Sequence, residues 1–463
     1  QTEKEFKLCR QNLFWCNCDD EEMNILFTMG VLDKVSFEQL PLGSDGKTIR
    51  VWPTKFVRTI KRNSSTGVNQ GRSRLVVIGI HHREGKEYSR KDAPTPLFSS
   101  MLHSIAEGTV RGAIKFQFDL AQFFQRTECD APEPIGLIPP TRYQKGADGK
   151  KIYYISKMWL QGAKGAGYAA RRRLVTILMK NDHVVFTPSA WDKCKFMHHS
   201  PRGEASFTLH VDDGCAGWAT TRSLAISLYD LLELHYPGVK WSIDKGEGDK
   251  YVCGWTEQLG FKVEHNPKTS KTKLTAPKHI EALKQFVSKD LHVTPRLPCS
   301  ETLKGLSPEK VLEPQEPGYE QQQQNIKFMY ECVGHIQHIA KIRMDCKLAA
   351  NICSRYSHAP CDIAMKNVKQ CAHYLIGTPD IGWECGHPGA TLKDLIWHEK
   401  LPDDYVYDPS HKILAYHGIV DGALSPNDRS ITGTIHMFGG AAIDANSSRQ
   451  HSIAEHAYVS EAY

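Results

Sequence analysis

The chain has 463 residues, which is long for one compact core, and about three domains are expected at this length. Its apolar share of 40% and charged share of 24% are those of an ordinary globular protein, and no apolar run approaches the roughly 18 residues of a membrane span. The 58 Lys and Arg against 52 Asp and Glu give a formal charge of +6, a mild excess that is compatible with a nucleic-acid partner without requiring one.

The N-terminus and the cysteines give no targeting address. The chain begins at Gln1 and continues with charged residues, so no signal peptide is expected, and the missing Met indicates a processed or incomplete chain. The 14 cysteines are scattered without a C-x-x-C pair, and the closest group (Cys9, Cys16 and Cys18) lacks an evident fourth zinc ligand. Free, mostly buried thiols in a reducing compartment are the favoured interpretation.

Helical and strand-like patterns alternate in the first half of the chain. A polar turn at 62–71 joins two apolar stretches, which predicts a hairpin with basic residues at both shoulders. In chain order the predicted elements are a helix followed by a turn in 21–35, strands at 49–59 and 74–80, a helix at 99–107, strands at 114–120 and 151–155, and a basic helix at 171–179 after the Gly/Ala-rich segment 160–170.

A Pro-, Glu- and Gln-rich segment at 297–324 is predicted to be a linker. Helical periodicity dominates directly after it, and strand patterns dominate from 411 onward. Between residue 200 and the linker, strands are predicted at 207–211 and in 246–254, and helices at 221–236 and 277–287. After the linker, helices are predicted at 326–342, 347–356 and 361–376, strands at 412–420 and 432–438, and the start of a helix at 453–462.

Three aspartates stand at the ends of apolar strands. Asp119 closes Phe-Gln-Phe-Asp, and Asp212 and Asp213 close Leu-His-Val-Asp-Asp. Adjacent carboxylates repel each other and lower stability unless a cation neutralises them, and nucleotidyl transfer uses two divalent ions held by such groups. The alternative is that the pair only starts a turn or caps the next helix, which is the commoner role of an isolated Asp-Asp.

A resemblance to a known family favours the chemical interpretation. Matching segments follow the family's order along nearly the whole chain, which resembles the reverse transcriptase module of copia-type (Pseudoviridae) LTR retrotransposons. The segments are RLVVIG at 74–79 for the family's ARLVAKG, DAPTP at 92–96 with Ser99 and Ser100 for FAPVVRLSSIR, DLAQFF at 119–124 for DVKTAF, LQGAKGAG at 160–167 for LYGLKQAP, and LHVDD at 209–213 for LYVDD. Further matches lie at 244–254, 330–340, 343–345 and 374–378.

The resemblance implies an α+β fold shaped as a right hand with fingers, palm and thumb, followed by a helical connection and a partial ribonuclease H-like domain. The palm is expected to be an antiparallel sheet backed by helices. The implied boundaries are 1–113 for the N-terminal segment and fingers, 114–260 for the palm with a finger insertion at about 130–180, 261–320 for the thumb and linker, 321–405 for the connection, and 406–463 for the ribonuclease H-like part.

The resemblance also implies roles for the residues of a polymerase site. Asp119 and Asp212 would bind two Mg²⁺ ions, for which Mn²⁺ could substitute, and the backbone carbonyl of Leu120 would be a further ligand. Asp213 would support this pair. Arg74 would bind the triphosphate, because a guanidinium group matches the spacing of phosphate oxygens.

Other residues of the resemblance would contact the nucleotide or the template. Lys61 is a second candidate for the triphosphate and is equally compatible with a solvated hairpin lysine. Phe124 falls at the aromatic gate against the 2′-hydroxyl, which implies a preference for deoxynucleotides. Gln161 and Gly162 would contact the incoming nucleotide, and Lys164 would contact the template backbone.

Two groups of residues lie outside this central site. Arg171, Arg172 and Arg173 on the basic helix would follow a nucleic-acid backbone or form a solvated face. Asp421 and Glu455 would be two metal ligands of the ribonuclease H-like part. The chain ends before the further carboxylates of that domain, so the resemblance does not extend to a complete nuclease site.

The implied function is RNA-directed DNA synthesis from an RNA template, a DNA or RNA primer and deoxynucleoside triphosphates, in a particle or ribonucleoprotein with protein partners and without a membrane. An active element would work in a cytoplasmic particle or the nucleus. The sequence departs from the family at Phe123, Tyr168, Ala170, His210 and Gly214. These departures leave a second interpretation open, a domesticated homologue with weak or no catalysis that binds RNA or serves as a structural subunit.

Overall fold

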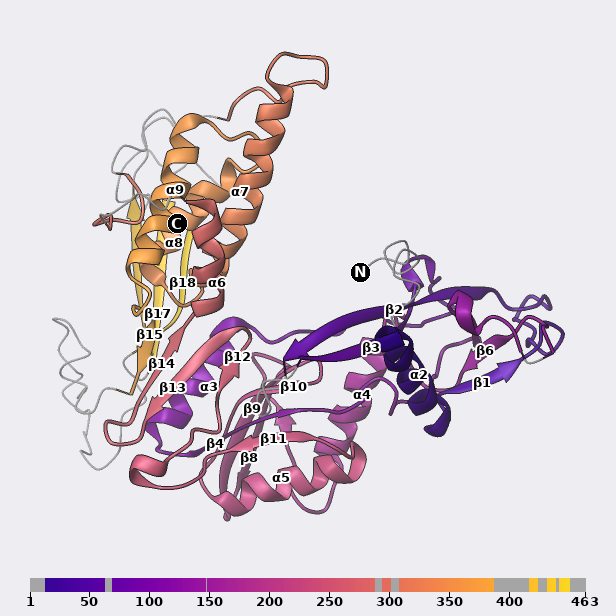
Figure 1. Ribbon diagram of the computed structural model, residues 1–463. Coiled ribbons are helices and arrows are strands. Elements are labelled where there is room, and N and C mark those ends of the chain that lie inside the picture. Colours follow the sequence, from indigo (N-terminus) through magenta and orange to yellow (C-terminus); the bar gives the residue numbers. More distant parts are fainter. Residues whose placement is uncertain are drawn as a thin grey trace.

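The computed structural model describes residues 13–62, 69–146, 148–287, 294–300, 308–386, 416–423, 431–438 and 441–449. Helices and strands are both abundant in this part of the chain, and the strands form sheets of five, six, four and three strands. Figure 1 shows the first sheet on the right, the second below the centre, and helices α7–α9 standing above with the last sheet beside them. None of the helices in the described ranges is both long and apolar enough to cross a membrane.

The five-stranded N-terminal sheet has the order β1-β6-β5-β2-β3. Its strands are β1 (Leu32–Val35), β2 (Val51–Arg62), β3 (Asn69–Val77), β5 (Ile135–Ile138) and β6 (Tyr153–Ser156), and helix α2 (Leu13–Thr28) packs against the edge strand β3. The predicted hairpin is confirmed as β2–β3. The helix and turn predicted in 21–35 are present, since α2 ends at Thr28 and Gly30 takes a left-handed φ of 66°. The helix begins earlier than predicted, at Leu13, and the strand β1 after the turn was not predicted.

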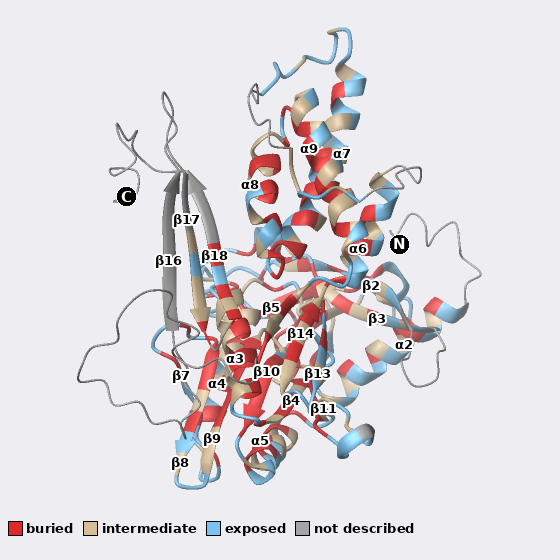
Figure 2. Cartoon of the chain, turned by 90° about the vertical axis from the view of Figure 1, so that its left-hand side faces the viewer, coloured by how far each residue is buried: buried red, intermediate tan, exposed pale blue. Residues whose placement is uncertain are grey.

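The six-stranded central sheet has the order β11-β4-β10-β9-β8-β7. Its strands are β4 (Ile114–Asp119), β7 (Thr187–Pro188), β8 (Lys195–Ser200), β9 (Gly203–His210), β10 (Asp213–Ala219) and β11 (Lys240–Ile243). Helices α4 (Ala166–Met179) and α5 (Arg222–His235) share one apolar cluster with the sheet, and α3 (Phe98–Val110) belongs to a second. Because Trp218 joins the second cluster and its neighbour Ala219 the first, the two clusters cover opposite faces of the sheet. Figure 2 shows buried residues concentrated in the strands of this sheet.

The remaining elements in the described ranges are four α-helices and two sheets, which lie on the α3 side of the central sheet. A four-stranded sheet of β12 (Glu257–Gln258), β13 (Phe261–Asn266), β14 (Lys271–Thr275) and β15 (Trp383–Cys385) carries helices α6 (Pro277–Leu283), α7 (Tyr319–Ile339), α8 (Lys347–Arg355) and α9 (Asp362–Gly377). The three predicted helices after the linker are confirmed, although α7 already begins at Tyr319, inside the predicted linker. The last sheet has β16 (Tyr416–Ala423), β17 (Ile431–Phe438) and β18 (Ala441–Arg449), and β18 contacts α3, α8 and β15.

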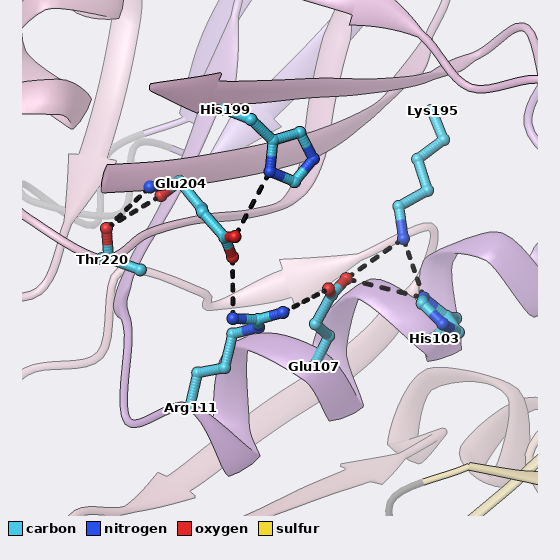
Figure 3. Close-up of polar contacts among 7 residues, drawn as sticks. All are labelled: His103, Glu107, Arg111, Lys195, His199, Glu204 and Thr220. Atoms are coloured by element: carbon cyan, nitrogen blue, oxygen red, sulfur yellow. Dashed lines mark hydrogen bonds and ion pairs between the residues drawn. The ribbon is translucent and has the colours of Figure 1, made fainter. Parts of the chain in front are cut away.

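A network of paired charges joins helix α3 to strands β8 and β9 of the central sheet (Figure 3). This α3 charge network consists of His103, Glu107, Arg111, Lys195 and Glu204. The Lys195 ammonium lies 2.8 Å from His103 Nδ1 and 3.2 Å from Glu107 Oε2. The Arg111 guanidinium continues the chain of contacts to Glu107 at 3.4 Å and to Glu204 at 2.7 Å. The side chains of Lys195 and Glu107 are only 8% and 15% exposed, so their opposite charges compensate each other away from solvent.

Candidate active site

The central sheet brings the three predicted aspartates together at one end of its strands β4 and β10. Asp119 ends β4, and Asp213 begins β10 directly opposite it in the antiparallel register. Asp212 lies between them in the β9–β10 turn, where its carbonyl oxygen accepts a hydrogen bond from the Leu120 amide at 3.0 Å. The turn holds Val211 at a φ of 60°, a costly conformation for a β-branched residue that persists only where the surroundings enforce it.

The carboxylates at this edge are not balanced by an equal number of fixed cations. Partial burial, followed by the negative charges of Asp212 and Asp119, raises the pKa of Asp213 to about 6. Burial and the charge of Asp119 also raise the pKa of Asp212, while the positive charges of Arg74 and His210 act in the opposite direction. The deprotonated cluster therefore lowers the stability of the fold and favours an added cation.

Lys240 is the basic residue in contact with this cluster, and sequence reasoning did not find it. It begins β11 opposite Asp119, and its ammonium lies 2.8 Å from Asp119 Oδ2. The two side chains are 69% and 39% exposed, so the pair is weak and readily exchanged for another partner. No local pattern marks Lys240, because only the long-range pairing of β11 with β4 brings it to the site.

A cavity of about 430 Å³ opens beside the carboxylates and contains most of the predicted nucleotide-binding residues. Phe123 and residues of helix α2 also line this cavity. The predicted site residues in its lining are Arg74, Asp119, Leu120, Phe124, Gln161 and Asp212. The Nε atom of Arg74 is buried and has no hydrogen-bond partner among the described residues. The side chain of Phe123 is 2% exposed and packs on Phe124 and Tyr236, so it does not fill the cavity.

A second cavity, of about 390 Å³, shares Asp119 and Lys240 with the first. Asp213, Trp241 and residues 257–260, which include strand β12, are among its other lining residues. The ion pair between Lys240 and Asp119 therefore borders two recesses, and both are accessible to a ligand that approaches Asp119.

Close packing explains why positions 162 and 214 are glycines. A Cβ atom on Gly162 would lie 2.1 Å from the Val77 carbonyl, and its φ is 85°. A Cβ atom on Gly214 would lie 2.2 Å from the Phe118 ring, which explains why this position of the hairpin has no apolar side chain. Both glycines let chain segments approach closely, and Gly162 lines a different cavity from Gln161.

Lys164 and the basic helix lie away from the carboxylates. Lys164 Nζ donates a hydrogen bond to the His82 carbonyl at 3.3 Å. Arg171 donates to the Lys193 carbonyl at 2.6 Å, Arg172 pairs with Asp130, and Arg173 lies 5.3 Å from the centre of the Tyr236 ring. The three arginines thus contact separate parts of the chain, and their role toward nucleic acid stays a prediction.

Other predicted site residues are described in part or not at all. Lys61 lies in β2 opposite Gln70, and its side chain is outside the described part of the chain. Asp421 lies in β16 opposite Gly433, and its side chain is likewise not described. Glu455 and the predicted helix at 453–462 lie outside the described residues.

The donor chemistry of the carboxylate cluster fits a hard divalent cation. Within the described ranges, no three or more His, Cys, Asp or Glu side chains are grouped closely enough to hold a metal by themselves. Mg²⁺ does not need such a cage, because proteins usually bind it through one or two carboxylates together with water and substrate phosphates. Asp119 and Asp212 line one cavity with Arg74 and supply this partial ligand set.

Comparisons with known proteins give no family assignment. No family model matches the chain, and no curated protein matches it. A solved structure of a foamy viral protease-reverse transcriptase in complex with double-stranded DNA aligns with 92% of this chain and 54% of its own, at 12% identity and a TM-score of 0.40. The complex of the foamy viral enzyme with an RNA/DNA hybrid aligns with 93% of this chain and 42% of its own, at 11% identity and a TM-score of 0.39. The chain thus spans about half the length of these proteins or less.

Proposed function

We propose that the chain is an RNA-directed DNA polymerase of the copia type, with Asp119, Asp212 and Asp213 at its reaction centre. One observation carries this proposal: the carboxylates of Asp119 and Asp212 line one cavity with Arg74, whose buried Nε atom has no hydrogen-bond partner among the described residues. Such a pairing of an acidic edge with a basic group suits a ligand that brings both a cation and an anion. A nucleoside triphosphate bound with Mg²⁺ is a ligand of this kind.

Each residue of the cavity has a separate role in nucleotidyl transfer. Asp119 and Asp212 hold the divalent ions, which when bound activate the primer 3′-hydroxyl and neutralise charge on the triphosphate. Arg74, whose Nε atom has no hydrogen-bond partner among the described residues, binds phosphate oxygens through its guanidinium group. Phe124, which lines the same cavity, lies against the sugar and disfavours a 2′-hydroxyl, and Gln161, another lining residue, contacts the nucleotide.

Lys240 competes with a metal ion for the Asp119 carboxylate, because its ammonium group contacts Oδ2. The exposure of both side chains makes this exchange inexpensive, since a surface ion pair contributes little to stability. The same contact also supports the second candidate function, a non-catalytic homologue that binds RNA or acts as a structural subunit. In that case the Lys240 ammonium would be the permanent counter-charge of the cluster.

Primer extension distinguishes the two candidates. The full chain is incubated with poly(rA)/oligo(dT), deoxythymidine triphosphate and either Mg²⁺ or Mn²⁺, in parallel with Asp212→Asn. A polymerase extends the primer, and the variant loses at least about 100-fold in rate, because removal of a direct metal ligand costs more than the loss of a group that only orients one. Extension no greater than that of the variant would favour the non-catalytic homologue.

A further inference from the structure

Helix α2 closes the outer edge of the N-terminal sheet. Among the strands in the described ranges, β3 pairs with β2 alone, so alternate amides along β3 have no partner in these strands. The Asp19 carboxylate accepts a hydrogen bond from the Ser73 hydroxyl at 2.6 Å, and Glu22 Oε1 accepts one from the Leu75 amide at 3.2 Å. The two acids are three residues apart and therefore lie on the same face of the helix.

Glu22 also belongs to the cavity of the candidate active site. It lines this cavity together with Arg72 and Arg74 of β3, and the aspartates Asp119 and Asp212 line the same cavity. Burial raises the pKa of the Glu22 carboxyl, while the Leu75 amide and the positive charges of Arg72 and Arg74 oppose this shift. Its negative charge thus acts on the guanidinium groups that face the cavity.

We propose that Glu22 is a specificity-determining residue, whose carboxylate sets the anion affinity of Arg72 and Arg74. A negative charge on this wall repels a ligand in proportion to the ligand's own charge. A free triphosphate is therefore repelled more strongly than a triphosphate already bound to Mg²⁺. Glu22 makes the cavity selective for the metal complex. The identity of the ligand as a nucleoside triphosphate rests on the proposed function, whereas the electrostatic effect does not.

The substitution Glu22→Gln separates this role from the closing of the sheet edge. The glutamine amide oxygen can still accept the hydrogen bond from the Leu75 amide, but its side chain carries no charge. Glu84→Gln is the matched control, because Glu84 is exposed, does not line the cavity, and loses the same charge. Glu21→Gln gives an intermediate case, since Glu21 lines the cavity from an exposed position of α2.

The binding of inorganic tripolyphosphate tests the proposal without any catalysis. Each full-length variant is titrated by calorimetry at low salt without divalent ions. We expect Glu22→Gln to bind about five- to tenfold more tightly than the unchanged chain, the effect of one charge in a partly solvated site. Glu21→Gln should gain less and Glu84→Gln nothing. Added Mg²⁺ or high salt should reduce the gain, because both weaken the repulsion.

Several results would overturn the role of Glu22. Equal affinity of Glu22→Gln and the unchanged chain would do so, as would the absence of tripolyphosphate binding to both. If circular dichroism showed that the Glu22→Gln chain is unfolded, the proposal would also be overturned. The charge of Glu22 would then be needed to hold α2 on the sheet. A gain in affinity without primer extension would instead leave this role standing and reject the polymerase. Primer extension with unchanged affinity would reject only the role of Glu22.

Discussion

Two clusters of ionisable side chains on the central sheet are built on opposite principles. In the α3 charge network, Lys195 and Arg111 alternate with Glu107 and Glu204, and each charge touches one of opposite sign (Figure 3). At the strand ends, by contrast, three carboxylates share one edge, and the cation in contact with them is an exposed lysine. The first arrangement holds helix α3 on the sheet. The second lowers stability and is therefore expected where a ligand supplies the missing charge.

The largest predicted effect breaks the balance of the α3 charge network. Glu107→Gln leaves the Lys195 ammonium buried without its carboxylate, so the free energy of unfolding should fall by about 3–5 kcal/mol. Urea denaturation followed by circular dichroism measures this change. Glu309→Gln, an exposed glutamate outside the network, is the control and should unfold like the unchanged chain. A loss below about 1 kcal/mol would show that the network is a surface-type ion pair.

Acidification is predicted to affect the two clusters in opposite directions. The raised pKa of Asp213, about 6 against 3.8, means that the folded chain takes up a proton first, so this group adds stability as the pH falls through 6. Burial, followed by the charge of Lys195, lowers the pKa of His103 to about 4 from 6.5. The unfolded chain takes up this proton first, so the His103 contribution is lost as the pH falls below 6.5.

Denaturation between pH 7 and pH 4.5 in the absence of divalent ions separates these contributions. Asp213→Asn should lose the stabilising part of the pH dependence, and His103→Gln the destabilising part, each on the order of 1 kcal/mol after allowance for solvent screening. Two variants with identical pH profiles would show that the two clusters do not differ in this way.

The smallest predicted effect concerns Lys240. Lys240→Met removes one exposed ion pair, so the free energy of unfolding should change by no more than about 0.5 kcal/mol. The same substitution frees the Asp119 carboxylate and should tighten Mn²⁺ binding, which electron paramagnetic resonance measures directly. Weaker Mn²⁺ binding in the variant would instead indicate that Lys240 helps to hold the site in its binding geometry.

Local patterns singled out Asp119, Asp212 and Asp213, but an isolated Asp-Asp more often starts a turn or caps a helix, and it was the resemblance to a polymerase family that favoured a chemical role. The register of β4 and β10 places Asp119 opposite Asp213, and the role of the three aspartates as metal ligands stays a prediction. Lys240 and Glu22 were missed because their positions depend on pairing and docking between distant segments, β11 with β4 and α2 with β3. No periodicity in the sequence encodes such contacts.

The limits of prediction were similar for the fold. Long periodic stretches gave α7, α8 and α9, whereas the short strand β1, which follows a predicted helix and turn, was not predicted. Gly30 was the only local signal for the change of direction there, and a glycine near a helix end is compatible with several continuations. The packing of β1 against β6, more than a hundred residues later, decides the outcome.

The most direct test of the central claim compares stability and activity in one preparation of Asp213→Asn. If the carboxylates form a reaction centre, this variant should unfold at the same or a higher temperature than the unchanged chain without divalent ions, because it relieves repulsion, and it should lose extension of oligo(dT) on poly(rA). A variant that unfolds earlier and extends the primer at the unchanged rate would contradict the account.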